Sequence, residues 1–94
     1  MGFVQIIKLT SSKFEELEAA NKEWERATEG QRTVTRDIVC ENRDQTGEYW
    51  IIVEFPSYEA AMRNNDLPVT GQLAEKMAAL CDGPPEFVNL NVIR

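Results

Sequence analysis

The chain has 94 residues, of which 43% are hydrophobic and 28% are charged. These values predict a single folded domain over residues 1–94, because a domain commonly takes about 100–200 residues and disordered chains are less apolar. The formal net charge is −6, which argues against a nucleic-acid partner, since such affinity comes mainly from an excess of Lys and Arg. No histidine is present, so histidine bases and histidine metal ligands are excluded.

The two cysteines are too few for an iron–sulfur cluster or a structural zinc site. Cys40 and Cys81 lie far apart in the sequence, and we expect both to be reduced thiols that are buried as small hydrophobic groups. Residues 1–10 are too short and too polar for a signal peptide, and no stretch of about 18 apolar residues could span a membrane. The sequence therefore predicts a cytoplasmic protein that does not associate with membranes.

The first two predicted elements are a strand and a helix. Residues 3–9 are rich in β-branched and other apolar side chains, which is typical of a strand. Apolar side chains recur at helical spacing over residues 14–27, and Gly30 is placed to end that helix. Ser12 and Glu15 are three residues apart, as in a capping box, so we expect them to cap the start of the helix.

A hairpin and a second helix follow. Residues 33–41 and 48–55 have strand composition and are joined by a polar turn at 42–47, which predicts an antiparallel hairpin. Ser57 can cap the next helix. That helix is expected to break near Pro68, because proline lacks the backbone donor and clashes with the preceding turn.

The last elements complete a recognisable order. The helix is expected to resume over residues 70–80, and a final strand is predicted over residues 87–93. The order strand–helix–strand–strand–helix–strand predicts an α+β, ferredoxin-like fold, in which both helices cover one face of a four-stranded antiparallel sheet. The first and third strands would be central.

The central strands are apolar on both faces. The third strand has one apolar face made of Tyr49, Ile51, Val53 and Phe55, and a second made of Trp50 and Ile52. Two helices can cover only one face of the sheet, and a monomer rarely leaves a large apolar patch in water. We therefore predict a homodimer, a dimeric α+β barrel in which two sheets pack face to face and enclose a space.

Several polar side chains interrupt the predicted strands. Gln5 lies on the first strand and Arg36 on the second, and Asn89 and Asn91 share one face of the last strand because strand side chains alternate. A polar group in an otherwise apolar cavity can orient a ligand by hydrogen bonds, so these four residues are candidate ligand contacts. The alternative for the two asparagines is that they face water on an edge strand.

Other site chemistries find no support. The sequence has no phosphate-binding glycine motif and no hydrolase nucleophile elbow, and no cluster of Asp and Glu has the spacing of metal ligands. RNA-recognition domains share the ferredoxin-like order, but they need a basic and aromatic pattern that this sequence lacks. We therefore expect no metal site.

The element order and residues 53–62 resemble the dimeric α+β barrel superfamily, and within it the antibiotic biosynthesis monooxygenase group. Members of that group typically have the motif W-x-S-x-E-A after the third strand, followed by a histidine on the helix. Here the motif reads F-P-S-Y-E-A from Phe55, and Asn64 stands in the place of the histidine. Gln5 occupies a first-strand position that is often asparagine in members that act on quinols or haem.

The resemblance implies a homodimer that binds a small hydrophobic or aromatic molecule and has monooxygenase-like activity without metal or flavin. Phe55, Asn64 and Trp50 join the candidate ligand contacts on this basis. The residues that could line an apolar pocket are Trp24, Tyr49, Trp50, Phe55, Tyr58 and Met62, although aromatic side chains on such stripes usually just pack. The alternative function is a non-catalytic barrel that serves as a structural or stress-type binding module.

Overall fold

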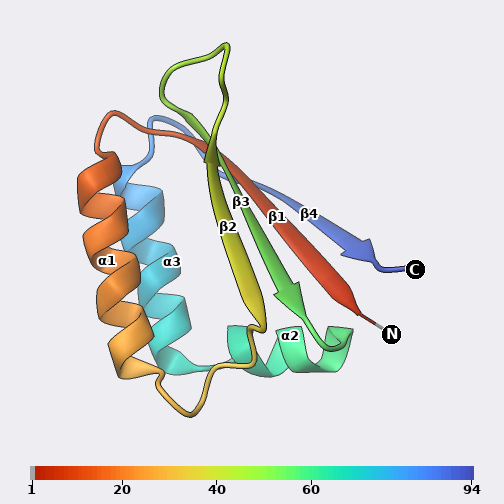
Figure 1. Ribbon diagram of the computed structural model, residues 1–94. Coiled ribbons are helices and arrows are strands. Elements are labelled where there is room, and N and C mark those ends of the chain that lie inside the picture. The colour runs from red at the N-terminus through yellow and green to blue at the C-terminus, as the bar shows by residue number, and fades with distance from the viewer. Residues whose placement is uncertain (1) are drawn as a thin grey trace.

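The computed structural model describes residues 2–94 (Figure 1). Its elements in chain order are β1 (Phe3–Thr10), α1 (Phe14–Ala27), β2 (Arg36–Glu41), β3 (Glu48–Phe55), α2 (Tyr58–Asn65), α3 (Pro68–Leu80) and β4 (Glu86–Asn91). The predicted α+β order is confirmed, with the second helical segment divided into α2 and α3.

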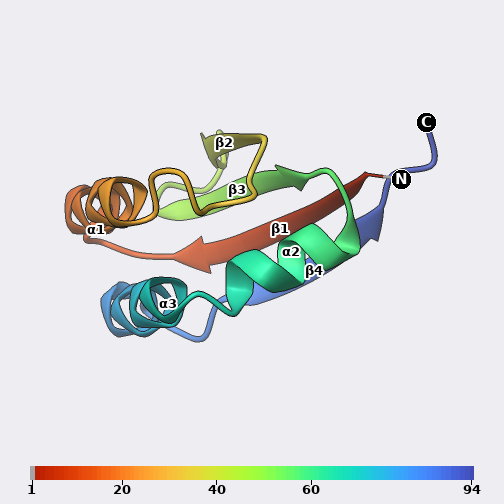
Figure 2. The ribbon, with the colours of Figure 1, turned by 90° about the horizontal axis from the view of Figure 1, so that it is seen from below.

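The four strands form one antiparallel sheet in the order β2-β3-β1-β4, so the first and third strands are central, as predicted. Figure 2 shows α1 and α3 on the same side of this sheet, and Figure 1 shows α2 across one end of the strands. In the register, Phe3 pairs with Phe55 of β3 and with Asn91 of β4. Directly opposed residues share a face of the sheet, so the register assigns every strand residue to one face or the other.

Local chemistry explains where α2 and α3 begin. Ser57 caps α2 as predicted, because its hydroxyl oxygen accepts a hydrogen bond from Ala60 N at 3.1 Å. Pro68 occupies the first turn of α3, where its missing N–H would have no intrahelical partner anyway. The same proline prevents α2 from continuing, so the predicted break is confirmed and α3 begins two residues before the expected residue 70.

The predicted capping box of α1 is wrong. α1 begins after Lys13, and no side chain caps it. Ser11 rather than Ser12 makes the hydrogen bonds at this point: its Oγ accepts from Lys13 N at 2.9 Å and donates to Leu80 O at 2.6 Å. Ser11 thereby joins the start of α1 to the end of α3 and fixes these two helices relative to each other.

β2 and β4 are shorter than predicted. Residues 33–35 form a connection before β2, in which Thr33 Oγ1 donates to Ala60 O at 2.5 Å and Thr35 N donates to Glu54 O at 2.9 Å. The first of these bonds directs the chain toward α2 instead of along the sheet. β4 ends at Asn91, because its partner β1 begins at Phe3 and offers no strand beyond that point.

Aromatic contacts attach the helices to both ends of the sheet. At one end Phe3, Phe55 and Ala61 form the buried core, and the Phe3 ring makes an edge contact with Tyr58 at a centroid distance of 5.4 Å. At the opposite end of β3, Tyr49 stacks on Phe14 of α1, with ring centroids 4.3 Å apart. The helix layer is thus packed onto the sheet at its two ends.

The face of the sheet turned away from the helices, here called the open face, is apolar at its centre. Its apolar residues are Val4, Ile6, Ile38, Trp50, Ile52, Val88 and Leu90. Trp50 is 38% exposed and Val88 is 45% exposed. Charged groups border this area: Lys8 lies 5.5 Å from the centre of the Trp50 ring, and Arg36 pairs with Glu54 at 3.5 Å. The prediction of a second apolar face is confirmed.

The two cysteines are free thiols in different surroundings. Cys40 is exposed, so the expectation that it is buried is wrong; it lies on the edge strand β2, which pairs only with β3. Cys81 follows α3 and is partly buried. Burial raises the pKa of Cys81, and the nearby carboxylate of Asp82 adds to that effect.

Glu48 accepts hydrogen bonds from Asn42 Nδ2 at 2.6 Å and from Trp50 Nε1 at 2.9 Å. These two bonds lower the pKa of Glu48 from its ordinary value of 4.5, and the charge of Lys8 acts in the same direction. A carboxylate with a lowered folded-state pKa stabilises the fold above its unfolded pKa, and this stabilisation is lost as the pH falls through the folded value.

We therefore expect Glu48→Gln to lower the thermal midpoint of unfolding near neutral pH. The difference between the two proteins should shrink as the pH falls below about 4.5, where both side chains become neutral. Circular dichroism melting at a series of pH values measures it. A difference that is the same at neutral and acidic pH would contradict this account of Glu48.

Candidate ligand-binding site

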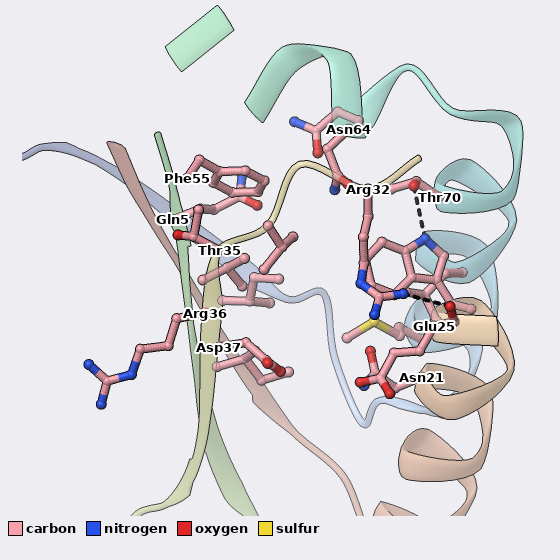
Figure 3. Close-up of a pocket in the computed structure, with 18 residues that line it drawn as sticks. Gln5, Asn21, Glu25, Arg32, Thr35, Arg36, Asp37, Phe55, Asn64 and Thr70 are labelled. Carbon is pink, nitrogen blue, oxygen red and sulfur yellow. Dashed lines mark hydrogen bonds between the residues drawn. The ribbon is translucent and has the colours of Figure 1, made fainter. Parts of the chain in front are cut away.

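A cavity of about 330 Å³ lies between the sheet and the helices (Figure 3). Its position is between the two packed ends of the sheet, where neither aromatic cluster fills the space. The apolar residues that line it are Ile7, Trp24, Val34, Ile51, Val53, Phe55, Leu73 and Met77. Small-molecule sites are typically concave and mostly apolar, begin at about 300 Å³, and carry a few polar groups that orient the ligand.

The amide of Asn64 faces the cavity from α2, and this residue is only 4% exposed. Thr33 N donates to Asn64 Oδ1 at 3.4 Å, which holds the amide at the edge of the cavity (Figure 3). Nδ2 donates no hydrogen bond to a group among residues 2–94. No buried side-chain nitrogen in this part of the chain lacks a partner, so Nδ2 is accessible to solvent. A donor that meets only water can exchange that water for a ligand oxygen, so Asn64 is placed to bind an oxygen atom of a ligand at the edge of the cavity.

Gln5 lies on the sheet side of the cavity. In the register it sits between Val53 of β3 and Asn89 of β4, and its Nε2 donates to Asn89 Oδ1 at 3.2 Å. This bond leaves Gln5 Oε1 as an acceptor and Asn89 Nδ2 as a donor. The two predicted residues therefore act as one polar pair, and Gln5 is the member that lines the cavity.

Trp24 and Thr70 hold together the two helices on the far side of the cavity. Trp24 Nε1 of α1 donates to Thr70 Oγ1 of α3 at 2.9 Å. The indole N–H is therefore satisfied within the protein, and the ring lines the cavity as an apolar surface. An aromatic ligand can stack on such a surface.

Arg32 lines the cavity and was missed by the sequence reasoning. It lies in the connection between α1 and β2, where no periodic pattern distinguishes it from other surface arginines. Its NH1 donates to Glu25 O at 2.6 Å and to Thr28 Oγ1 at 3.5 Å, and its guanidinium lies 6.0 Å from the centre of the Trp24 ring. No sequence signal marks this position, because these contacts depend on the folded connection.

Two carboxylates face the same cavity (Figure 3). Asp37 of β2 lies opposite Val53 in the register. Glu25 of α1 accepts a hydrogen bond from Asn21 Nδ2 at 3.2 Å through its Oε1. Together with Arg32, these residues give the cavity two negative charges and one positive charge, so its polar groups include both donors and acceptors.

Three of the predicted ligand contacts meet at this cavity, namely Gln5, Phe55 and Asn64. Two others point elsewhere. Trp50 belongs to the open face, and the Arg36 side chain turns away from the cavity toward Glu54 (Figure 3), so that Arg36 borders the cavity without directing its guanidinium into it.

Asn91 completes the set of predicted contacts. It is exposed and lies opposite Phe3 at the end of the sheet, and it does not line the cavity. The alternation of strand side chains places it on the same face as Gln5, but two residues farther along the ladder. A ligand role for Asn91 stays a prediction.

No group of three or more Cys, Asp or Glu side chains among residues 2–94 is arranged to hold a metal ion. None of the helices in this part of the chain combines the length and the apolar character that a membrane span requires.

No protein-family profile and no curated protein matches the sequence, whereas solved structures match the fold. SnoaB, a cofactor-independent oxygenase from Streptomyces nogalater, has a TM-score of 0.82 at 17% identity, over 99% of this chain and 94% of its own. An antibiotic biosynthesis monooxygenase has a TM-score of 0.76 at 13% identity, over the full length of both chains. The chain has the fold of the antibiotic biosynthesis monooxygenases.

The same fold extends to a conserved protein from Methanosarcina mazei Go1, with a TM-score of 0.84 at 10% identity, over 97% of this chain and 92% of that one. The fold expected from the F-P-S-Y-E-A segment and the element order is thereby confirmed. One fold can carry many activities, so the fold alone does not assign a function to this chain.

Proposed function

We propose that this chain binds a small aromatic molecule in the cavity and oxidises it with dioxygen, without metal or flavin. The observation that carries the proposal is the unpartnered Nδ2 of Asn64 in a largely apolar cavity of about 330 Å³. Apolar walls suit an aromatic ring, and an oxygen atom attached to that ring would accept the hydrogen bond from Asn64 Nδ2. The likeness in fold to a cofactor-independent oxygenase supports this proposal.

The proposed reaction is the oxidation of an activated methylene group, as in an anthrone-like quinol. The substrate loses a proton to give an anion, which supplies the electrons that reduce dioxygen. One oxygen atom then becomes the carbonyl oxygen at the methylene carbon, and the other leaves as water with the two hydrogens of that carbon. A hydrogen-bond donor aimed at the anionic oxygen favours formation of the anion, and Asn64 Nδ2 has this role.

We also propose that the chain forms a homodimer and is located in the cytoplasm. A second copy of the chain would cover the open face by packing the same surface against it around a two-fold axis. The cavity lies on the opposite side of the sheet, so each chain of the homodimer would keep its own site. Both cysteines are free thiols, which suits a cytoplasmic protein because thiols stay reduced there.

The proposed oxidation is tested by measuring the consumption of dissolved oxygen in the presence of anthrone. We expect one dioxygen to be consumed per anthrone, faster than without protein, and Asn64→Asp to reduce the rate by about tenfold or more, since losing one oxyanion donor costs on the order of 10²–10³. The aspartate keeps an oxygen for Thr33 N, removes the donor, and adds a negative charge that also disfavours an anion in the cavity. Gln45→Glu, the same chemical change in the exposed turn, should leave the rate unchanged.

Binding measurements separate the two candidate functions. In a Trp50→Phe background Trp24 is the sole tryptophan, and its fluorescence reports on the cavity. Anthrone binding without oxygen consumption would overturn the oxygenase and favour the non-catalytic binding module. If anthrone neither binds nor is oxidised, both functions are refuted for this class of ligand.

A further inference from the structure

Arg32 presents its guanidinium to the cavity in a fixed position. Its backbone N–H donates to Thr28 O at 3.0 Å, and its NH1 donates to Glu25 O and Thr28 Oγ1. Thr28 is fully buried and donates its own hydroxyl to Trp24 O at 2.7 Å. Backbone and side chain of Arg32 are therefore both held on the last turn of α1, beside the Trp24 ring.

Within residues 2–94 the charge of Arg32 has no counter-ion. No carboxylate among residues 2–94 lies within 4.0 Å of its guanidinium nitrogens; the groups that hold it are a carbonyl and a hydroxyl, which are neutral. A guanidinium has five N–H donors, and the bonds to Glu25 O and Thr28 Oγ1 use only NH1. The remaining donors are available to an anion in the cavity.

The same connection also orients Asn64. Thr33, the next residue after Arg32, donates its N–H to Asn64 Oδ1 and its hydroxyl to Ala60 O. Arg32 is exposed and Asn64 is buried, so one cavity offers a charged donor near solvent and a neutral donor inside. A ligand with an oxygen at each of two positions would satisfy both.

We propose that the ligand of this cavity is an aromatic carboxylate and that Arg32 binds its carboxylate group. The proposal rests on the proposed binding of an aromatic molecule and adds an acidic substituent to it. A carboxylate matches the planar fork of the guanidinium with two parallel hydrogen bonds. Trp24, over which the Arg32 guanidinium lies, also lines the cavity and offers the aromatic ring of the ligand an apolar contact beside that guanidinium.

The other charged groups of the cavity determine how the ligand is oriented and how many acidic groups it can carry. Glu25 and Asp37 both face the cavity, and each would repel a ligand carboxylate placed beside it. Arg32 is the only cation directed into the cavity among residues 2–94, because Arg36 turns to Glu54. The cavity therefore selects a monocarboxylate bound at Arg32 over a dicarboxylate.

Fluorescence titration of Trp24 with 2-naphthoate and its uncharged methyl ester tests the proposal. In the Trp50→Phe background we expect the acid to bind about tenfold more tightly than the ester, because a hydrogen bond to a charged group is stronger than one between neutral groups, and Arg32 is partly screened by water. Arg32→Gln should abolish this preference, Arg32→Lys should retain part of it, and Arg26→Gln, an equal charge change on the exposed side of α1, should leave it intact.

The ratio of the two affinities separates a direct contact from a structural role. If Arg32→Gln weakens acid and ester equally, Arg32 only shapes the cavity and the proposal is wrong. If the ester binds at least as tightly as the acid in the parent protein, the carboxylate preference fails while aromatic binding stands. If neither probe binds and anthrone also fails to bind, the proposed function fails together with this inference.

Discussion

Replacing Ile52 with glutamate should convert the proposed homodimer into a monomer. Ile52 lies in the central row of the open face, opposite Ile6 of β1 and Ile38 of β2. In a dimer through this face, the new carboxylate would be buried against an apolar surface without a cation, which costs several kcal/mol. The side chain points away from the cavity, so we expect the variant to fold and to keep its binding of naphthoate. Sedimentation velocity at micromolar concentration measures the change.

Thr46→Glu is the matched control for this substitution. Thr46 lies in the exposed turn between β2 and β3, so the variant gains the same charge away from the open face and should stay dimeric. The homodimer would be refuted if the unmodified chain sediments with the mass of one chain at the same concentration. A dimeric Ile52→Glu protein would show instead that the chains meet through another surface.

Phe3→Ala should cause the largest loss of stability among single substitutions in the core. Phe3 is 5% exposed and contacts both Phe55 and Tyr58, with ring centroids 6.3 Å and 5.4 Å away. Truncating a buried phenylalanine typically costs about 3–5 kcal/mol, because both the buried area and the packing around it are lost. A small domain has a total stability of about 5–15 kcal/mol, so the urea midpoint should fall steeply.

Phe87→Ala is the corresponding control on the same face of the sheet. Phe87 pairs with Ile7, but it is 56% exposed on the edge strand β4. The loss should be about 1 kcal/mol or less, since surface substitutions usually have small effects. Similar losses for the two variants, measured by urea unfolding, would show that the end of the sheet near α2 is not the dominant core.

The sheet could be predicted from the sequence because strands have a period of two and this sheet has two apolar faces. Residues 49–53 are an unbroken run of aromatic and β-branched side chains, which is typical of a strand, and β3 spans Glu48–Phe55. The start of α1 could not be predicted in the same way. Ser11 and Ser12 are adjacent and chemically identical, and what distinguishes them is the carbonyl of Leu80, a group 69 residues away that only the folded chain brings near Ser11.

The candidate site could be predicted where it lies on regular elements. Gln5, Phe55 and Asn64 line the cavity, and each was identified from its place on a strand or in a helix motif. Arg32 could not be found, because the connection between α1 and β2 has no periodicity from which a side-chain direction follows. For Arg36 the sequence did not reveal which face of the sheet the side chain occupies. Its pairing with Glu54 places it on the open face.

The side chains of β3 lie alternately on the cavity side and on the open face of the sheet. Ile51, Val53 and Phe55 line the cavity, and the even-numbered residues, such as Ile52, lie on the open face. Insertion of a single residue early in this strand would exchange the two sets, because each shift by one position turns a side chain through the sheet. The proposed ligand contacts and the proposed subunit contacts would then be lost together. Natural variation in the length of this chain is therefore expected in the turn at 42–47 and not within β3.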